Sequence, residues 1–381
     1  MPRFWAEVKS QGTPLVETIE GDGENLLVTF LWRSPENKYV AVFPMARLNT
    51  LRHILSRLPG TDLWYKSYKM RRDARFIYLV SINDSLAPFA VERPGEKGGW
   101  IAALRPDPLN LKRYVEPKDP ETPGDEDYVG SAVELPDAPS QPFVSLRPGV
   151  AKGRVELIRY DSKLLKNRRR IWVYTPPAYE RQGAPNRLLI LFDGRQYMQA
   201  TPTPTILDNM IADGRIPPVV AVMVGHVDRL AELAESPQFA DFVANELVPW
   251  VRQKYRVTQD PRQTVIGGLS LGGLGAAYAA LRHPEVFGNV LSQSGSFQHG
   301  LEQGGGLIEQ FAIKEKVAVR FYLEAGLFEI GGVPSLLHSN RHLRDVLRAK
   351  GYEVEYSEFN GRHDHIGWRG SLSQGLVELV R

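Results

Sequence analysis

Cysteine is absent from the 381 residues of this chain. Its absence excludes disulfides, thiolate metal sites and cysteine nucleophiles, and fits a reducing compartment. The chain also lacks a run of about 18 to 20 apolar residues, which a membrane-spanning helix needs. Its first residues include the charged Arg3, Glu7 and Lys9, with no apolar core of a signal peptide. We therefore expect a soluble, cytoplasmic protein with no membrane partner.

Neither sign of charge dominates. The chain has 47 Lys and Arg residues against 44 Asp and Glu residues, a formal net charge of +3. The basic residues are scattered among acids, without the basic run that is typical of a nucleic-acid groove, so we expect no nucleic-acid partner. The slight positive balance is compatible with an anionic small-molecule substrate but does not require one.

Length and pattern divide the chain into three segments. Residues 1–112 carry short runs of β-branched and aromatic residues between turn signals, which predicts a small β-sandwich domain. Residues 113–150 are rich in proline and acids and are predicted to be a linker. In residues 151–381, apolar strand-like runs alternate with helical patterns such as 238–255. This alternation predicts an α/β fold with a mostly parallel sheet covered on both faces.

A nucleophile motif lies in this α/β segment. Residues 268–272 read Gly-Leu-Ser-Leu-Gly, which matches G-x-S-x-G. The strand-like residues 264–266 precede it and the alanine-rich, helical residues 275–282 follow, as a nucleophile elbow requires. A structural turn is the alternative, but the setting favours Ser270 as the nucleophile of a serine esterase on an α/β-hydrolase domain.

An esterase also needs donors for the oxyanion of its tetrahedral intermediate. The backbone N–H of Leu271, at the start of the helix after Ser270, is the first candidate. The second is expected in the loop after an earlier strand, where a backbone N–H near Gly194 or Arg195 is the candidate. An ordinary Asp-Gly turn explains this loop equally well.

The base and the acid of a triad should follow Ser270 in the order acid, then histidine. His363, in the loop after the last predicted strand, is the expected base, with His365 as the close rival. Glu329, beyond the end of the preceding strand, is the expected acid, while Glu324 within that strand is the alternative. Either carboxylate could instead be a solvated acid or a salt-bridge partner. Asp364 could cap the final helix or contact a substrate.

Further motifs extend along almost the whole chain. They are, in order, TDLWY at 61–65, DPLN at 107–110, SAVELPDAP at 131–139, VYTPP at 173–177, GLSLGG at 268–273, LEAG at 323–326, HD at 363–364 and WRG at 368–370. As a set they resemble the enterochelin (enterobactin) esterases, which open the trilactone of ferric catecholate siderophores. The elbow alone is generic to esterases, whereas the N-terminal and linker matches make the resemblance specific.

The resemblance implies a small-molecule ferric catecholate siderophore as the substrate. It also implies Ser270 as nucleophile, His363 as base, and no cofactor of the protein's own, since the iron arrives with the substrate. Residues 229–233 (RLAEL) correspond to the family's R-x-x-E-L segment near the site. A trianionic ferric tris-catecholate favours a guanidinium partner, so Arg229 and then Arg195 are expected to bind substrate. The alternative for either is an arginine bound to a nearby carboxylate.

Two other functions fit parts of the pattern. One is a feruloyl or acetyl esterase that acts on carbohydrate esters, with the N-terminal domain as a binding module. The other is a non-catalytic siderophore-binding protein. The absence of an export signal disfavours the first, and the complete set of serine, acid and histidine in the expected order disfavours the second.

Overall fold

A computed structural model describes residues 1–42, 53–83, 104–301 and 306–380. The chain divides into two compact units. The N-terminal unit comprises Met1–Pro139 together with two short loops from later in the chain, Leu327–Gly332 and Asn360–Gly367. The C-terminal unit comprises Ser140–Gly326, Val333–Phe359 and Trp368–Arg381.

The N-terminal unit is built mainly from antiparallel strands in small sheets, ordered β1-β2-β5-β4, β6-β10-β9 and β3-β7-β8. Its elements are α1 (Pro2–Gln11), β1 (Leu15–Ile19), β2 (Asp22–Arg33), β3 (Val40–Val42), β4 (Ser56–Arg57), β5 (Leu63–Arg71), β6 (Arg75–Tyr78), β7 (Val80–Ile82), β8 (Leu104–Arg105), β9 (Arg113–Glu116) and β10 (Tyr128–Glu134). The core follows from strand alternation, since Leu26, Val28 and Phe30 of β2 are buried while Leu27 and Thr29 between them are half-buried.

The segment predicted to be a linker, residues 113–150, differs from that expectation in its first part. It contains β9 and β10, which pair with each other, and β10 also pairs with β6. The acidic, proline-rich residues 117–127 form the connection between these two strands. The reason is the burial of β10. Residues 130–133 of this strand are buried, and this burial stabilises the strand although the neighbouring residues are rich in turn formers.

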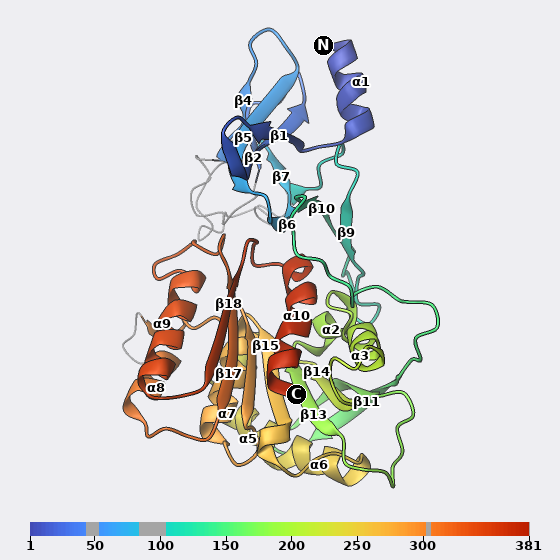
Figure 1. Ribbon diagram of the computed structural model, residues 1–381, viewed down its shortest axis with the longest axis vertical. Helices are drawn as coiled ribbons and strands as arrows, with labels where there is room; N and C mark the ends of the chain where they lie inside the picture. Colours follow the sequence, from blue (N-terminus) through green and yellow to red (C-terminus); the bar gives the residue numbers. More distant parts are fainter. Residues whose placement is uncertain (43–52, 84–103, 302–305, 381) are drawn as a thin grey trace. The chain divides into compact units, whose positions relative to one another are not determined.

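The C-terminal unit is organised around an eight-stranded sheet of order β11-β12-β14-β13-β15-β16-β17-β18 (Figure 1). The strands from β14 to β18 in this order are parallel, and β11 and β12 add an antiparallel edge. Their bounds are β11 (Arg154–Ser162), β12 (Asn167–Thr175), β13 (Arg187–Phe192), β14 (Val219–Val224), β15 (Thr264–Leu269), β16 (Asn289–Gln293), β17 (Arg320–Gly326) and β18 (Val354–Phe359).

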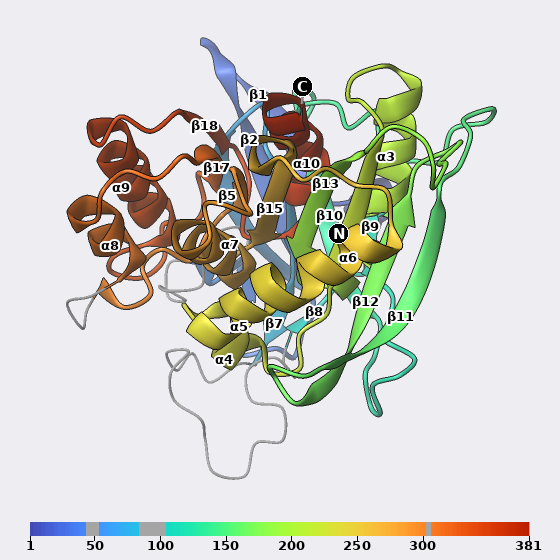
Figure 2. The same cartoon turned by 90° about the horizontal axis from the view of Figure 1, so that it is seen from below.

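Helices cover both faces of this sheet. They are α2 (Gly194–Gln199), α3 (Thr203–Ala212), α4 (Arg229–Leu233), α5 (Pro237–Phe242), the π-helical turn η3 (Val243–Leu247), α6 (Val248–Lys254), the 3₁₀ turn η4 (Pro261–Gln263), α7 (Leu271–Arg282), α8 (Leu307–Ile313), α9 (Leu336–Ala349) and α10 (His365–Val380). The predicted helical segment 238–255 corresponds to α5, η3 and α6. Figure 2 shows α5, α6 and α7 on one side of the sheet, and α3 and α10 on the other.

Two apolar cores result, one on each face, and they explain the nearly continuous apolar strands. All six residues of β14 are buried, as expected for a strand with helices on both sides. One core includes Phe242 of α5 and Leu274 of α7, and the other includes Ile206 of α3 and Leu372 of α10. The predicted α/β fold is therefore confirmed. Among the described residues, no helix is both long and apolar enough to cross a bilayer.

Candidate active site

Ser270 lies on a sharp turn between β15 and α7. Its backbone has φ 56° and ψ −121°, a conformation that is strained for a residue with a side chain. Gly268 makes the turn possible, because a Cβ on it would lie 2.5 Å from the backbone carbon of Gly272. The backbone N–H of Ser270 donates to the Gln293 carbonyl at the end of β16, 2.9 Å away. The turn thus has the geometry of a nucleophile elbow.

Both candidate oxyanion donors begin a helix. Leu271 is the first residue of α7, and Gly194 is the first residue of α2. Each follows a non-glycine residue with positive φ, Ser270 and Asp193 respectively, at the ends of the adjacent strands β15 and β13. Gly194 has no room for a side chain, because its Cβ would lie 2.7 Å from the carbonyl of Met223. Backbone N–H groups in a first helical turn have no intrahelical acceptor, which suits them to bind an anion.

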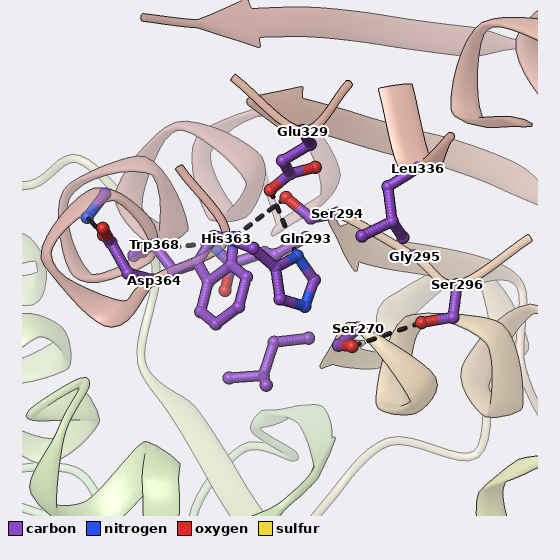
Figure 3. Close-up of polar contacts among 12 residues, drawn as sticks. Ser270, Gln293, Ser294, Gly295, Ser296, Glu329, Leu336, His363, Asp364 and Trp368 are labelled. Atoms are coloured by element: carbon purple, nitrogen blue, oxygen red, sulfur yellow. Dashed lines mark hydrogen bonds and ion pairs between the residues drawn. The ribbon is translucent and has the colours of Figure 1, made fainter. Parts of the chain in front are cut away.

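A second hydroxyl contacts the nucleophile. The Oγ atoms of Ser270 and Ser296 are 3.2 Å apart (Figure 3), and the Ser296 N–H donates to the Ser270 carbonyl. Sequence reasoning missed Ser296. The available signal was the small polar run Ser294-Gly295-Ser296 directly after β16, the strand next to that of the nucleophile.

Glu329 and His363 form a pair in the two loops of the N-terminal unit. His363 Nδ1 lies 3.2 Å from Glu329 Oε1 (Figure 3). The carboxyl group of Glu329 is fully buried, whereas about a third of the His363 side chain is exposed, 34%. A buried carboxylate at one ring nitrogen orients the imidazole and favours its proton on Nδ1.

The rival residues have other partners. Glu324 is within β17, is fully buried, and accepts hydrogen bonds from Gln293 and Tyr322. Burial, together with the Glu324 carboxylate, raises the pKa of Tyr322 well above its ordinary value. His365 Nε2 lies 3.9 Å from Glu116 of β9. The contacts therefore favour Glu329 over Glu324 as the partner of a catalytic histidine, and His363 over His365 as that histidine.

Two pairs of residues are thus in contact, and only one of them, Glu329 with His363, joins two predicted residues. Ser270 contacts Ser296 in the C-terminal unit, and Glu329 contacts His363 in the N-terminal unit. The loop of Glu329 continues directly from the carboxyl end of β17, and that of His363 from the end of β18. Since parallel strands end at one edge of a sheet, these loops start from the same edge that carries the elbow.

Asp364 is held by backbone groups next to the histidine. It accepts hydrogen bonds from the N–H of Ile77, at 2.8 Å, and of Gly367 in the first turn of α10, at 3.3 Å. The second contact is the helix cap that was one of its two expected roles. Shielding from water raises the pKa of Asp364 to about 6, against the opposing effects of these N–H groups and of the Arg362 charge.

Arg229 has a carboxylate partner. Its Nε and Nη2 donate to the two oxygens of Asp193 at 2.6 and 2.8 Å, and Nη2 also lies 3.4 Å from the Leu269 carbonyl. These contacts match the alternative stated for this residue, an arginine bound to a nearby carboxylate, rather than a guanidinium reserved for substrate. Arg195 is the second residue of α2 and is partly buried. In the described part of the chain, no three His, Asp or Glu side chains are grouped to hold a metal ion.

Comparison with known families gives matches in both parts of the chain. Residues 162–379 match the family described as "Putative esterase", and residues 27–144 match the family described as "Enterochelin esterase, N-terminal". Together these two matches cover most of both units.

Individual relatives match the chain nearly end to end. An iron(III) enterobactin esterase of Escherichia coli (strain K12) is 31% identical over 92% of this chain and 90% of its own length. That of Dickeya dadantii (strain 3937) is 32% identical over 99% of this chain and 92% of its own length. The crystal structure of an enterobactin esterase from Shigella flexneri, obtained in the presence of enterobactin, aligns with a TM-score of 0.76 at 28% identity. That alignment covers 100% of this chain and 98% of the Shigella chain.

Proposed function

The chain belongs to the enterochelin (enterobactin) esterase family, and on this basis we propose that it hydrolyses the lactone esters of ferric catecholate siderophores of the enterobactin type. The observation that carries the proposal is the similarity to iron(III) enterobactin esterases over more than nine-tenths of the chain, N-terminal unit included. The protein is a carboxylic ester hydrolase, and its elbow supplies the nucleophile that ester hydrolysis needs.

We propose that Ser270 Oγ attacks a lactone carbonyl carbon of the siderophore ring. His363 accepts the hydroxyl proton, and the carbonyl oxygen becomes a tetrahedral oxyanion. The carbon–oxygen bond of the ester then breaks, and the protonated imidazole gives its proton to the departing alkoxide. The product of this half-reaction is an acyl-enzyme in which the opened siderophore is bound to Ser270 through an ester.

The second half-reaction repeats these roles with water. His363 removes a proton from a water molecule, which attacks the acyl-enzyme, and the same proton then returns to Ser270 as the linear acid departs. We propose that Glu329 keeps the His363 proton on Nδ1 and stabilises the imidazolium. This leaves Nε2 as the atom that takes up the proton. The 3.2 Å contact between Glu329 and His363 Nδ1 supports this role.

The oxyanion is proposed to rest on the backbone N–H groups of Leu271 and Gly194. Both begin helices at the ends of adjacent strands, which supports the pairing. Ser296 is proposed to hold the hydroxyl of Ser270 before the substrate arrives. Once the Ser270 proton has passed to His363, the Ser296 hydroxyl can donate a hydrogen bond toward the same oxygen.

We propose that this chemistry uses no cofactor of the protein's own, because serine, histidine and glutamate supply the nucleophile, the base and the acid. Iron enters as part of the substrate. Breaking one ester opens the ring and leaves the three catechols on a linear backbone, which preorganises them less well, so the iron is more easily released. A cytoplasmic site for this reaction stays a prediction.

The test is the Ser270→Ala variant. We expect the purified variant to bind ferric enterobactin with an affinity close to that of the wild type and to release no linear product. Product masses after incubation give the turnover, and quenching of intrinsic fluorescence gives the binding. Turnover at the wild-type rate would contradict the assignment of Ser270.

The two other functions are not favoured. Relatives that match more than nine-tenths of this chain include iron(III) enterobactin and salmochelin esterases. The strained turn at Ser270, with its positive φ, supports an enzyme over a binding protein. Assaying feruloylated sugar beside enterobactin under the same conditions separates the two esterase functions. Covalent labelling of Ser270 by a fluorophosphonate separates an enzyme from a binding protein.

A further inference from the structure

A charged cluster lies between the loop of Gly194 and the nucleophile elbow, all within the C-terminal unit. Its members are Asp193, His226 and Arg229. The carboxyl group of Asp193 is fully buried and receives two hydrogen bonds from Arg229. His226 Nδ1 lies 3.3 Å from the same carboxylate. We call these three residues the Asp193 cluster.

The cluster connects the two loops that carry the candidate oxyanion donors. Asp193 immediately precedes Gly194, and Arg229 also lies 3.4 Å from the carbonyl of Leu269, which immediately precedes Ser270. The second oxygen of Asp193 lies 2.8 Å from the point where a Cβ of Gly272 would be, so the carboxylate packs directly against the first turn of α7. One ion pair, with a buried carboxylate and a partly exposed guanidinium group, therefore contacts the chain close to both donors.

Both the backbone conformation and the buried charge of Asp193 are energetically unfavourable by themselves. Asp193 adopts φ 56° and ψ 47°, a left-handed conformation that is uncommon for a residue with a side chain, directly before Gly194. Burial by itself raises the pKa of its carboxyl group, but the hydrogen bonds and charge of Arg229, with His226 close by, outweigh that effect and leave the pKa below its ordinary value. A buried carboxylate without such partners is strongly unfavourable.

From these contacts we infer that Arg229 is a positioning residue for ester hydrolysis: by clamping Asp193 against the elbow, it fixes the spacing of the Gly194 and Leu271 N–H groups. This inference rests on the proposed function, since it presumes that these groups bind an oxyanion. It differs from the expectation that Arg229 binds the anionic siderophore. A positioning residue acts on the transition state of any ester, whereas a binding residue acts on charged substrates only.

The two roles predict different kinetics for Arg229→Met, which keeps an unbranched, flexible side chain but removes the guanidinium group and its charge. For a positioning role, we expect kcat to fall about 10- to 100-fold, because small displacements of catalytic groups have effects of this size. The fall should be similar for ferric enterobactin and for the neutral ester p-nitrophenyl butyrate. KM for ferric enterobactin should stay within about threefold of the wild-type value, since uniform substrate binding is unchanged.

Two further variants separate function from folding. Arg229→Lys keeps a charge that can bond one oxygen of Asp193, and it should recover part of the lost kcat. Asp193→Asn keeps a side chain that tolerates the left-handed conformation but weakens the clamp, so it should lower kcat in the same way. Arg168→Ala is the matched control, because Arg168 is an exposed arginine of the same unit, 64% exposed, and its loss should leave both substrates unaffected. If Arg229→Met does not fold, the Lys and Asn variants carry the test.

The rate of labelling by a fluorophosphonate gives a readout that does not depend on the siderophore. We expect Arg229→Met to slow labelling of Ser270 by the same factor as kcat. The inference would be overturned in favour of substrate binding if Arg229→Met labelled Ser270 and turned over the neutral ester at wild-type rates, while its KM for ferric enterobactin rose tenfold or more. If the wild-type enzyme turned over p-nitrophenyl butyrate but not enterobactin, the proposed substrate would be wrong while the positioning role could still be measured.

Discussion

Two glutamates five positions apart show how surroundings decide the role of a carboxyl group. Glu324 is inside β17, where Gln293, Tyr322 and Ser371 contact its oxygens. Glu329 is in the loop that follows, and its Oε1 lies next to His363. Its other oxygen, Oε2, is buried and has no hydrogen-bond partner among the described residues. A buried carboxylate oxygen without a hydrogen bond destabilises the fold. A functional role, such as stabilising a protonated His363, therefore explains this glutamate better than a structural one.

Substituting each glutamate by glutamine separates the two roles. Glu329→Gln should lower kcat by about 10²- to 10⁴-fold, because an amide neither stabilises the imidazolium nor enforces its tautomer. Glu324→Gln should leave kcat within a few-fold and lower the free energy of unfolding by about 1–3 kcal/mol, since it disturbs a buried hydrogen-bond network. Steady-state kinetics and urea unfolding measure the two effects. The opposite pattern would make Glu324 the acid.

At the scale of elements, the nucleophile depends on a strand, a turn and a helix that meet without side chains between them. A Cβ on Gly268 would lie 2.5 Å from the backbone of Gly272, and one on Gly273 would lie 2.4 Å from Ser292 Oγ. The first obstacle is backbone, which cannot move aside, whereas the second is a short side chain. Gly268 is therefore the position in the elbow that least tolerates a side chain, although the contact at Gly273 is slightly shorter.

We expect Gly268→Ala to move the elbow and lose most of the activity. The free energy of unfolding should fall by about 1–3 kcal/mol or more, as for other overpacked sites. The control is Gly23→Ala in β2, where a new Cβ meets nothing within 4 Å. Circular dichroism, urea unfolding and fluorophosphonate labelling measure both variants. Gly268→Ala with wild-type labelling would show that the elbow tolerates a side chain there.

Strands and helices were predictable where the hydrophobic periodicity of the sequence is clear. The apolar strands and the helical segment 238–255 follow from hydrophobic periodicity, because burial on one or both faces leaves a regular trace in the sequence. The strands β9 and β10 were not predicted, because their short apolar runs adjoin a proline-rich, acidic connection. Only pairing of β10 with β6, more than fifty residues earlier in the chain, reveals them.

At the scale of the whole molecule, the chain does not divide at one point. The loops Leu327–Gly332 and Asn360–Gly367 group with the N-terminal unit, although both follow strands of the large sheet. Contacts within that unit explain this grouping. Phe328 packs against Phe76, Asn360 donates to Asp73, and Asp364 accepts from Ile77. The proposed acid and base are therefore carried by loops that belong structurally to the N-terminal unit.

The pKa of Asp364 couples the stability of this arrangement to pH. Its pKa is about 6 in the folded protein against an ordinary value of 3.8, so the folded state holds the proton more tightly than the unfolded state. The cost of burying the charge is complete above about pH 6, and it disappears as the pH falls from about 6 to about 4. The difference between pKa values of about 6 and 3.8 corresponds to a destabilisation of the folded state of at most about 3 kcal/mol, because the side chain keeps some contact with solvent.

Asp364→Asn removes the titration. Its single oxygen can accept from only one of Ile77 and Gly367, which bond different oxygens of Asp364, and the loss of the other bond is the same at every pH. Between about pH 7 and pH 4, the free energy of unfolding of the wild type should rise relative to that of the variant, by up to about 3 kcal/mol. Urea unfolding of both proteins at the two pH values gives the difference. If the free energies of unfolding of the two proteins differed by the same amount at both pH values, Asp364 would not titrate in this range.

The sequence by itself determined the fold class, the nucleophile motif and the order of serine, acid and histidine. These features depend on short-range patterns: strand and helix periodicity, the glycines around Ser270, and the positions of loops after strands. Tertiary structure decided the partners. Glu329 meets His363 across 34 positions, and Arg229 meets Asp193 across 36. Contacts at such separations depend on how the loops pack, so the sequence could name the candidate residues but could not say that Arg229 would bind a carboxylate of its own chain.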